Sequence, residues 1–313
     1  MAYTKEEFKQ LVDDIQGQSW YKNPIGFGIA KVDRGQINKD KILQATFPLI
    51  NWNENFGSAA VLLNALKVAG ENVDTSKSEL VAKISDEFLT SCIEAFRPFI
   101  PEAKGDVHKN VQVISTLASL PIDSGLTADD YRVVFIFEDV APESTEAVYL
   151  KLYALSTGKA ALRSLNLTGA FGKLHNCAWV GNQPIELDWL RANEIVLKLS
   201  GKYPNIDMVD KFPRFLQHII PADNTRILET SKVRMGAQLA AGTTVMPGAA
   251  YVNFNAGTLG AVMVEGRISS SAVVGAGSDV GGGASILGVL SGTDGVPVSI
   301  GENTLLGANS CTG

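Results

Sequence analysis

The sequence has 313 residues, enough for two domains, and its 27 Lys and Arg residues against 33 Asp and Glu residues give a net charge of −6. This balance offers no broad basic field for a nucleic-acid backbone or an anionic membrane surface. The opening residues, MAYTKEEFKQ, lack the apolar stretch of a secretory signal. We therefore expect a cytoplasmic protein that binds neither nucleic acid nor a membrane.

The cysteines and the first helical patterns are typical of an ordinary globular chain. Cys92, Cys177 and Cys311 are widely spaced and contain no CxxC pair, which favours free thiols over a disulfide framework or a zinc knuckle. The segment TKEEFKQLVDDIQ has Thr4 and Glu7 at capping-box spacing and predicts a short amphipathic helix. In ELVAKISDEFLTSCIEAF, the apolar residues recur at helical spacing and predict a helix with a buried cysteine: Val81, Ile84, Phe88 and Cys92.

Strand and helix patterns alternate up to about residue 224. RPFIPEAKGD ends the preceding helix, and YRVVFIFEDV predicts a buried strand. The segments STEAVYLKLYALSTG and PIELDWLRANEIVLKLSG predict helices that end at Gly158 and Gly201. We interpret residues 1–125 as an N-terminal α/β region of unknown role and residues 126–224 as an α/β domain that contributes to a substrate site.

A different pattern with a period of six begins near residue 225. Glycine often follows the apolar residue, and a small residue stands at the fifth place, as in VGAGSD and LGANSC. A hexapeptide parallel β-helix has this pattern, whereas an α-helix or a strand with alternating polar and apolar residues does not. Residues 225–313 are therefore expected to form such a coil, with these residues pointing inward: Ile227, Val233, Leu239, Val245, Tyr251, Val262, Ile268, Val274, Val280, Ile286, Ile300 and Leu306.

Glu265 and Arg267 are isolated charges within this uncharged ribbon. With Val262 and Ile268 inward, they fall at the fourth and sixth places, which face outward. A solvated ion pair on the surface contributes little to the stability of a protein. The absence of other charges near Glu265 and Arg267 instead favours a functional site. The segment SGTDGVP, residues 291–297, interrupts the period and predicts a loop at a corner.

Several other chemistries fit the sequence poorly. VGAGSDVGGG has Val280 where a dinucleotide-binding motif needs its third glycine, and no GxxxxGK[ST] loop occurs. The three histidines are His108, His175 and His218, so the repeat region has none for a zinc site of the γ-carbonic-anhydrase kind or for a general base. If the protein transfers an acyl group, a carboxylate must therefore act as the base or nucleophile, unless His175 reaches the site from outside the repeats. A position in the core or at an interface fits His175 better. The flat threonine face of an ice-binding β-helix is also missing.

The repeat region resembles the tetrahydrodipicolinate N-succinyltransferases of the actinobacterial and pseudomonad type. The segments that carry the resemblance are VNFNAGTLGAVMVEGRISSSAVVGAGSDVGGGASILGVLSG, SIGENTLLGANS, RMGAQLAAGTTVMPG and VDKFPRFLQHIIP, with a looser match in YLKLYALSTGKAALRSLNLTGAFGKLHN. It covers roughly residues 130–313, and residues before 125 carry no match. The resemblance implies a left-handed β-helix, a homotrimer with active sites between subunits, and transfer of succinyl from succinyl-CoA to an amine in the diaminopimelate and lysine pathway.

The resemblance also implies roles for particular residues. Glu265 matches the family's catalytic glutamate, described as forming an acyl anhydride. The residues that match succinyl-CoA contacts are Arg267, Gly282, Ser285 and Ala308. Some relatives bind magnesium through carboxylates where this sequence has Ser231 and the PGAA run, so no metal is predicted. The end of the chain, LLGANSCTG, stops in mid-coil, and we expect the β-helix to be shortened at this end.

Two alternatives to this function stay open at the level of sequence. One is another CoA-dependent hexapeptide N-acyltransferase that acts on an amino sugar or a different amino acid. The other is a non-catalytic trimeric β-helix scaffold. The fold alone does not choose between them, whereas the Glu265–Gly266–Arg267 sequence inside its long flanking match favours the succinyltransferase.

Overall fold

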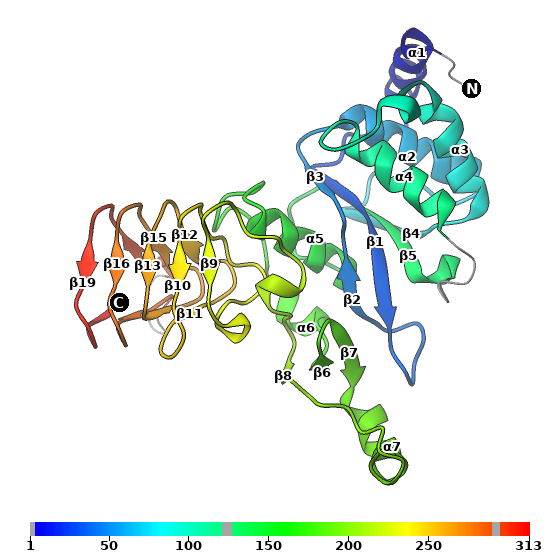
Figure 1. The fold of residues 1–313 in the computed structure, drawn as a ribbon. Coiled ribbons are helices and arrows are strands. Elements are labelled where there is room, and N and C mark those ends of the chain that lie inside the picture. Colours follow the sequence, from blue (N-terminus) through cyan, green and yellow to red (C-terminus); the bar gives the residue numbers. More distant parts are fainter. Residues whose placement is uncertain (1–3, 121–126, 290–294) are drawn as a thin grey trace. The chain divides into compact units, whose positions relative to one another are not determined.

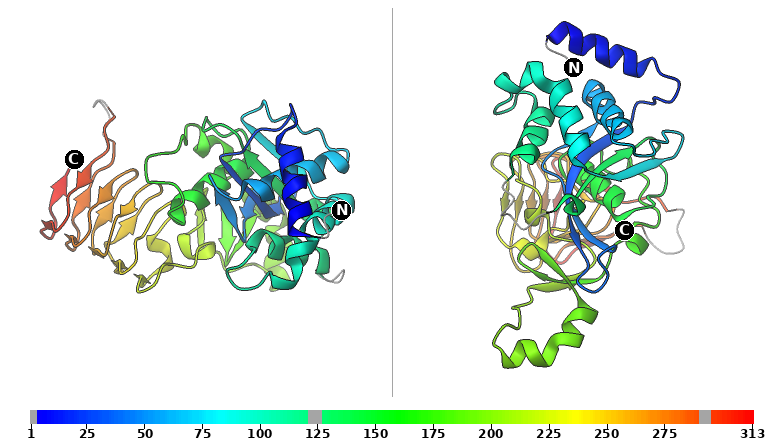
Figure 2. Two further views of the ribbon diagram at one scale, coloured as in Figure 1. Left: turned by 90° about the horizontal axis from the view of Figure 1, so that it is seen from above. Right: turned by 90° about the vertical axis from the view of Figure 1, so that its right-hand side faces the viewer.

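The chain folds into two compact units in a computed structural model that describes residues 4–120, 127–289 and 295–313 (Figures 1 and 2). The first unit is Met1–Leu150 with Leu167–Lys173, and the second is Lys151–Asn166 with Leu174–Gly313. The first unit therefore continues through residue 150, and the boundary expected at residues 125 and 126 lies outside the described residues. The reason is that β5 (Tyr131–Ile136) pairs along its length with β1 (Gly26–Arg34) in the sheet of the first unit.

An antiparallel sheet forms the first unit's framework. Its strand order is β2-β1-β5-β4, and β3 also pairs with β1. YRVVFIFEDV thus supplies a buried strand as predicted, and Phe27, Ile29, Val133 and Phe135 alternate along β1 and β5 to join the core that the helices cover. The other strands are β2 (Ile42–Thr46), β3 (Ile50–Trp52) and β4 (Glu79–Lys83).

Helices gather on one side of this sheet (Figure 1). The first helix has the predicted capping box, with Thr4 as N-cap and Glu7 returning its side chain to the Thr4 amide. The helix predicted over residues 79–96 is wrong in its first part, because residues 79–83 pair with β5 and Ser85 caps a helix that starts at Asp86. Cys92 is fully buried, and burial raises the pKa of its thiol. The helical segments are α1 (Lys5–Gln16), α2 (Phe56–Val68), α3 (Asp86–Phe96), η1 (Arg97–Glu102), α4 (Lys109–Ser119), η3 (Ala128–Asp130) and α6 (Ala170–Lys173).

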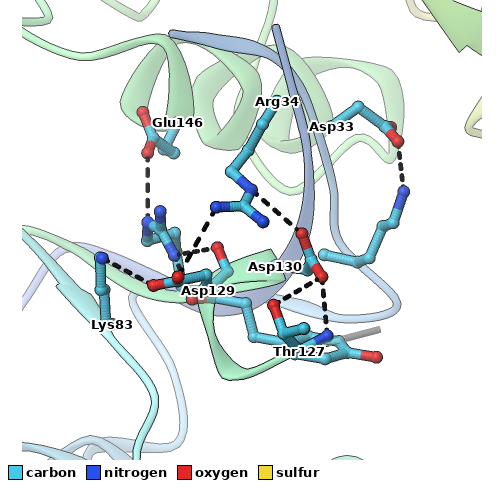
Figure 3. A network of polar contacts seen from close by, with 10 residues as sticks. Asp33, Arg34, Lys83, Thr127, Asp129, Asp130 and Glu146 are labelled. Carbon is cyan, nitrogen blue, oxygen red and sulfur yellow. Dashed lines mark hydrogen bonds and ion pairs between the residues drawn. The ribbon is translucent and has the colours of Figure 1, made fainter. Parts of the chain in front are cut away.

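A polar network ties the ends of β1, β4 and η3 together (Figure 3). Arg34 Nε lies 3.2 Å from an Asp130 carboxylate oxygen, and Lys83 Nζ lies 2.6 Å from Asp129. Arg132 Nε lies 3.9 Å from Glu146 at the start of α5 (Thr145–Ser156). Three cations face three carboxylates, so the network is balanced in charge and its role is structural.

The second unit begins with a small antiparallel sheet of order β7-β6-β8. Both predicted helices end as expected, because α5 and α7 are followed by Gly158 and Gly201 at φ of +70° and +69°. The start of PIELDWLRANEIVLKLSG lies in a strand before its helix. The elements are β6 (Cys177–Val180), β7 (Gln183–Glu186), α7 (Leu187–Leu199), β8 (Met208–Asp210) and η4 (Phe215–Gln217). None of the helices in the described ranges is long and apolar enough to cross a membrane.

Residues from 226 onward form parallel coils with three sides, as the period of six predicts (Figure 2). Each side is one sheet whose strands come from successive coils. The first side contains β9 (Arg226–Ile227), β10 (Thr244–Val245), β13 (Met263–Val264), β16 (Asp279–Val280) and β19 (Leu305–Leu306). The second contains β11 (Tyr251–Val252), β14 (Arg267–Ile268), β17 (Ser285–Ile286) and β20 (Cys311–Thr312), and the third contains β12 (Gly257–Thr258), β15 (Val273–Val274) and β18 (Ser299–Ile300). The corner before the second side includes η5 (Thr230–Lys232) in the first coil.

The inward register differs from the prediction at two places. Val252, not Tyr251, is the fully buried residue of β11, because an extra residue lengthens the corner before it. In β13 the inward residue that stacks on Val280 is Val264 rather than Val262, although Val262 is also buried. From Ile268 to Ile286 the predicted spacing of six is confirmed. Part of the loop predicted over 291–297 lies outside the described residues.

Arg163 joins three coils from outside. Its main-chain N–H donates to the Asn255 side chain at 2.8 Å, and its guanidinium donates to the carbonyls of Ser271 and Val298, each at 2.6 Å. The residue has a φ of +68°, which directs its backbone toward the coils. Bonds from one guanidinium to two successive coils hold these layers in register.

His218 gives the second unit a pH-dependent stability. Its Nδ1 lies 2.8 Å from the Tyr153 hydroxyl, and burial lowers the pKa of the imidazole to about 3. The unfolded ring titrates near ~6.5, so this stabilisation is complete above that pH and is lost as the pH falls toward 3. We expect the difference in unfolding free energy between the parent and His218→Gln to shrink by about 1.4 kcal/mol per pH unit below pH ~6. Urea unfolding at pH 8, 7, 6 and 5 measures it, and a constant difference would contradict the assignment.

Gly266 is required by the close stacking of two coils. A β-carbon at this position would lie 2.3 Å from the carbonyl oxygen of Ala284, a backbone atom that cannot move aside. We expect Gly266→Ala to destabilise the coils by about 1–3 kcal/mol, the usual cost of overpacking. Gly282→Ala is the matched control, because the nearest atom to a β-carbon there is 3.7 Å away. Thermal unfolding of both variants tests the prediction, and equal melting temperatures would argue against the stacking seen here.

Candidate active site

One corner of the coil collects most of the residues that the sequence singled out. This corner connects the first side to the second in every coil. It comprises residues 265–266 between β13 and β14, residues 281–284 between β16 and β17, and residues 307–310 between β19 and β20. Glu265, Gly282 and Ala308 therefore lie on three successive coils at the same edge, with a spacing of about 5 Å per coil.

Glu265 sits where the corner is shortest. It directly follows the inward Val264, and only Gly266 separates it from Arg267 at the start of β14. Its amide donates to the Val280 carbonyl at 2.8 Å, which fixes the backbone against the next coil. The side chain is half-buried, and a carboxylate oxygen lies 3.7 Å from where a β-carbon of residue 282 would be. Gly282 thus leaves open space beside the carboxylate.

Arg267 is oriented by the coil that follows. Its Cα pairs with Ser285 in β17, and its Nε donates to the Ser285 hydroxyl at 2.9 Å. The guanidinium is exposed and is held by Ser285 rather than by Glu265. Its outer amino groups have no partner within the described ranges, so they can bind a carboxylate in bidentate fashion.

Two backbone amides at the same edge are also available. The N–H groups of Gly282 and Ala308 donate no hydrogen bond within the described part of the chain. By contrast, their neighbours are engaged: Gly281 donates to the Leu306 carbonyl and Asn309 to the Gly282 carbonyl, both at 3.0 Å. Free amides in a row can hold carbonyl or oxyanion groups of a ligand. The structure therefore brings all five predicted residues together.

Tyr251 is a neighbour of the site that the sequence analysis placed in the core. It pairs with Arg267 on the side opposite Ser285, so Tyr251, Arg267 and Ser285 form an outward row across three coils. Burial raises the pKa of the Tyr251 phenol, and the positive charges of Arg234 and Arg214 oppose this shift. The sequence does carry a signal for this, because Val252 follows Val245 by one position more than the period of six requires.

The coils that form this corner carry no histidine, since residues 226–313 contain none. His218 is bonded to Tyr153, and His175 is half-buried at a position before β6. Within residues 4–120, 127–289 and 295–313, no group of three or more His, Cys, Asp or Glu side chains could hold a metal ion.

Comparisons with known proteins agree over the whole length of the chain. The profiles described as tetrahydrodipicolinate N-succinyltransferase N-terminal and middle match residues 6–172 and 174–214, so the similarity includes the first 125 residues as well. Proteins named 2,3,4,5-tetrahydropyridine-2,6-dicarboxylate N-succinyltransferase from Sulfurovum sp. and Nitratiruptor sp. are 70% and 67% identical, over 98% and 100% of this chain and 77% and 79% of their own. A crystal structure of a Campylobacter jejuni 2,3,4,5-tetrahydropyridine-2-carboxylate N-succinyltransferase superposes with a TM-score of 0.94 at 58% identity, covering 100% of this chain and 80% of that one. The chain therefore belongs to the tetrahydrodipicolinate N-succinyltransferase family and is an acyltransferase.

Proposed function

We propose that this protein transfers the succinyl group of succinyl-CoA to the amine of ring-opened tetrahydrodipicolinate, L-2-amino-6-oxopimelate. The reaction belongs to the synthesis of diaminopimelate and lysine, and we place it in the cytoplasm. The observation that carries the proposal is the shortened corner, where the Glu265 carboxylate faces the open space over Gly282 and only Gly266 separates Glu265 from Arg267. A carboxylate and a guanidinium in this arrangement suit an acyl donor that itself ends in a carboxylate.

The donor is bound by its two ends. The outer amino groups of Arg267 hold the succinyl carboxylate, and the hydroxyl of Ser285 keeps the guanidinium in place at 2.9 Å. The unpartnered amides of Gly282 and Ala308 receive the thioester oxygen and the amide carbonyls of the CoA arm. Both sets of contacts direct the thioester carbon toward Glu265.

Glu265 carries the chemistry in one of two ways. As a nucleophile, its carboxylate oxygen attacks the thioester carbon and expels the CoA thiolate, which leaves a mixed anhydride. The acceptor amine then attacks the anhydride and forms the amide, which releases the Glu265 carboxylate, and the proton lost by the amine passes to this carboxylate or to the CoA thiolate. As a general base, Glu265 instead removes the proton from the amine as it attacks the thioester directly, and the thiolate leaves as CoA.

Assembly and metal content follow from the same proposal. We propose that the coils wind left-handed and that three copies associate, with active sites between neighbouring subunits. Helix α7 supports self-association, because Ile195, Val196 and Leu199 are 77%, 60% and 85% exposed on one short stretch, an apolar surface that a second copy would cover. Ser231 and the 247–250 run stand where metal-binding relatives have carboxylates, so the proposal includes no metal ion.

Removal of the carboxylate tests the role of Glu265. Glu265→Gln is nearly isosteric and lies outside the core, so we expect the fold to persist while turnover falls by about a hundredfold or more. The measurement is thiol release at saturating succinyl-CoA and tetrahydrodipicolinate. Mass spectrometry after mixing with succinyl-CoA alone separates the two routes, because only the anhydride route succinylates Glu265 before the acceptor arrives.

Glu302→Gln is the matched control for this experiment. Glu302 is an exposed glutamate of the same coils at a different corner, between β18 and β19. Its substitution should leave turnover within a few-fold of the parent, and light scattering should give a trimer mass for all three proteins. Turnover of Glu265→Gln close to that of Glu302→Gln would remove Glu265 from the chemistry.

Donor selectivity tests the role of Arg267. The ammonium of Arg267→Lys cannot reproduce the bidentate fork, so we expect the preference for succinyl-CoA over acetyl-CoA to fall by about tenfold or more. The ratio of kcat/KM for the two donors measures it. Ser285→Ala removes only the hydroxyl that orients Arg267, so its effect on the ratio should be smaller. An unchanged ratio in Arg267→Lys would place the clamp elsewhere.

A further inference from the structure

Two arginines share one carboxylate at the start of the coils. Arg234 contacts Asp210 through both ends of its guanidinium, with Nε 3.1 Å and Nη2 2.8 Å from the same oxygen and Nη2 3.1 Å from the other. Arg214 contacts Asp210 once, with Nη1 2.8 Å away. A backbone bridge sets Arg214 and Arg234 side by side, and Phe212 lies under the Arg234 guanidinium. The three side chains are only 11–20% exposed.

This cluster carries one positive charge in excess. In the network of Figure 3 each cation has a carboxylate of its own, whereas here two guanidiniums share one. Arg234 contacts both oxygens of Asp210. The Nε of Arg214 is buried without any hydrogen-bond partner among the described residues. A buried cation with an unused hydrogen-bond donor lowers the stability of the fold unless an anion pairs with it. Arg214 is therefore the side chain of this cluster that keeps an unused donor.

Arg214 lines a cavity of about 590 Å³. Polar side chains share its wall, namely Asn182, Gln217, Thr230 and Ser231. Those of Asn182 and Gln217 donate to the carbonyls of Gln217 and Gly181. Two carboxylates also lie there, but both have donors: Asp207 accepts the Gly181 amide at 2.7 Å, and Glu229 accepts from Ser231 and pairs with Lys232. Among the described residues that line this cavity, Arg214 is the one that carries a positive charge.

The cavity opens at the same corner of the coil as Glu265. Thr230 and Ser231 belong to η5, which is this corner in the first coil, and Gly248 occupies it in the second. Lys232 Nζ donates to the Gly248 carbonyl at 2.7 Å, so the two corners are in contact. Glu265 follows in the third coil. Two coil spacings therefore separate the cavity wall from Glu265, on the order of 10 Å.

The acceptor in the proposed function is a seven-carbon chain with a carboxylate at each end. Its amine is attached beside one carboxylate and must reach Glu265, which leaves the other carboxylate at the far end of the chain. We propose that Arg214 and the cavity around it bind this far carboxylate of the acceptor. The proposal rests on the proposed function, and it makes Arg214 the residue that selects a dicarboxylate.

Two probe acceptors separate recognition of the far carboxylate from chemistry. L-2-Aminopimelate carries both carboxylates, and L-2-aminoheptanoate lacks the far one. With the parent enzyme we expect kcat/KM for succinylation to favour the first by about tenfold or more. In Arg214→Gln this preference should disappear through a rise in KM for L-2-aminopimelate, while KM for succinyl-CoA stays within about threefold.

Two further variants guard against a simple structural effect. Arg214→Gln leaves Asp210 and Arg234 as a neutral pair, so its melting temperature should stay close to the parent's, and Arg214→Lys should restore part of the preference because the charge remains. Arg226→Gln is the matched control, because Arg226 is an exposed arginine on the first side of the first coil, where its Nε donates to Thr244 of the next coil. It should keep the parent's preference.

The possible failures can be told apart. If the parent prefers the dicarboxylate and Arg214→Gln retains that preference, the cavity does not bind the far carboxylate, and the proposed function stands. If the parent succinylates neither acceptor nor tetrahydrodipicolinate, the proposed function itself fails. If Arg226→Gln loses the preference as fully as Arg214→Gln, the effect is one of general charge and the assignment to Arg214 is overturned.

Discussion

Hydrogen bonds between successive coils determine where every side chain of the second unit points. Each strand of a side bonds to the strand one coil away, as Arg267 does to Ala284 at 2.7 Å and Gly275 to Ile300 at 2.9 Å. Residues far apart in sequence are thereby stacked about 5 Å from one another in fixed register. A site on such a surface is a column of residues taken from consecutive coils. Its composition changes whenever one coil gains or loses a residue.

The shortened corner at Glu265 and Gly266 illustrates this effect. The next two coils place four residues between the first and second sides, and this coil places two. A carboxylate directly after an inward residue and a guanidinium directly before the next one are brought to the same edge. The chain can turn this tightly because Gly266 has no β-carbon to meet the Ala284 carbonyl. The repeat is thus broken where the chemistry is proposed, as expected where function competes with regularity.

The period of six predicted the coil and the outward places of Glu265 and Arg267, whereas Gly282, Ser285 and Ala308 came from the resemblance to the family. The period did not place Tyr251 or Val264 correctly, because corner length depends on which backbone groups bond between coils, and composition does not record this. The strand at residues 79–83 was taken for helix because its apolar residues continue the spacing of α3, and pairing with β5 overrides that pattern. The Arg214 cluster escaped notice because its members come from β8, η4 and the first coil.

Charge balance distinguishes structural from functional clusters in this protein. Where ion pairs only join elements, as at the ends of β1 and β4, each cation has its carboxylate. Arg267 has no ion pair among the described residues, and Arg214 shares its carboxylate with Arg234; both arginines lie in the same unit, and both proposed substrates end in carboxylates. If one arginine served both substrates, the acceptor would compete with the donor for it. Separate arginines, one beside Glu265 and one about two coils away, let each substrate carboxylate find its own partner while the amine and the thioester meet between them.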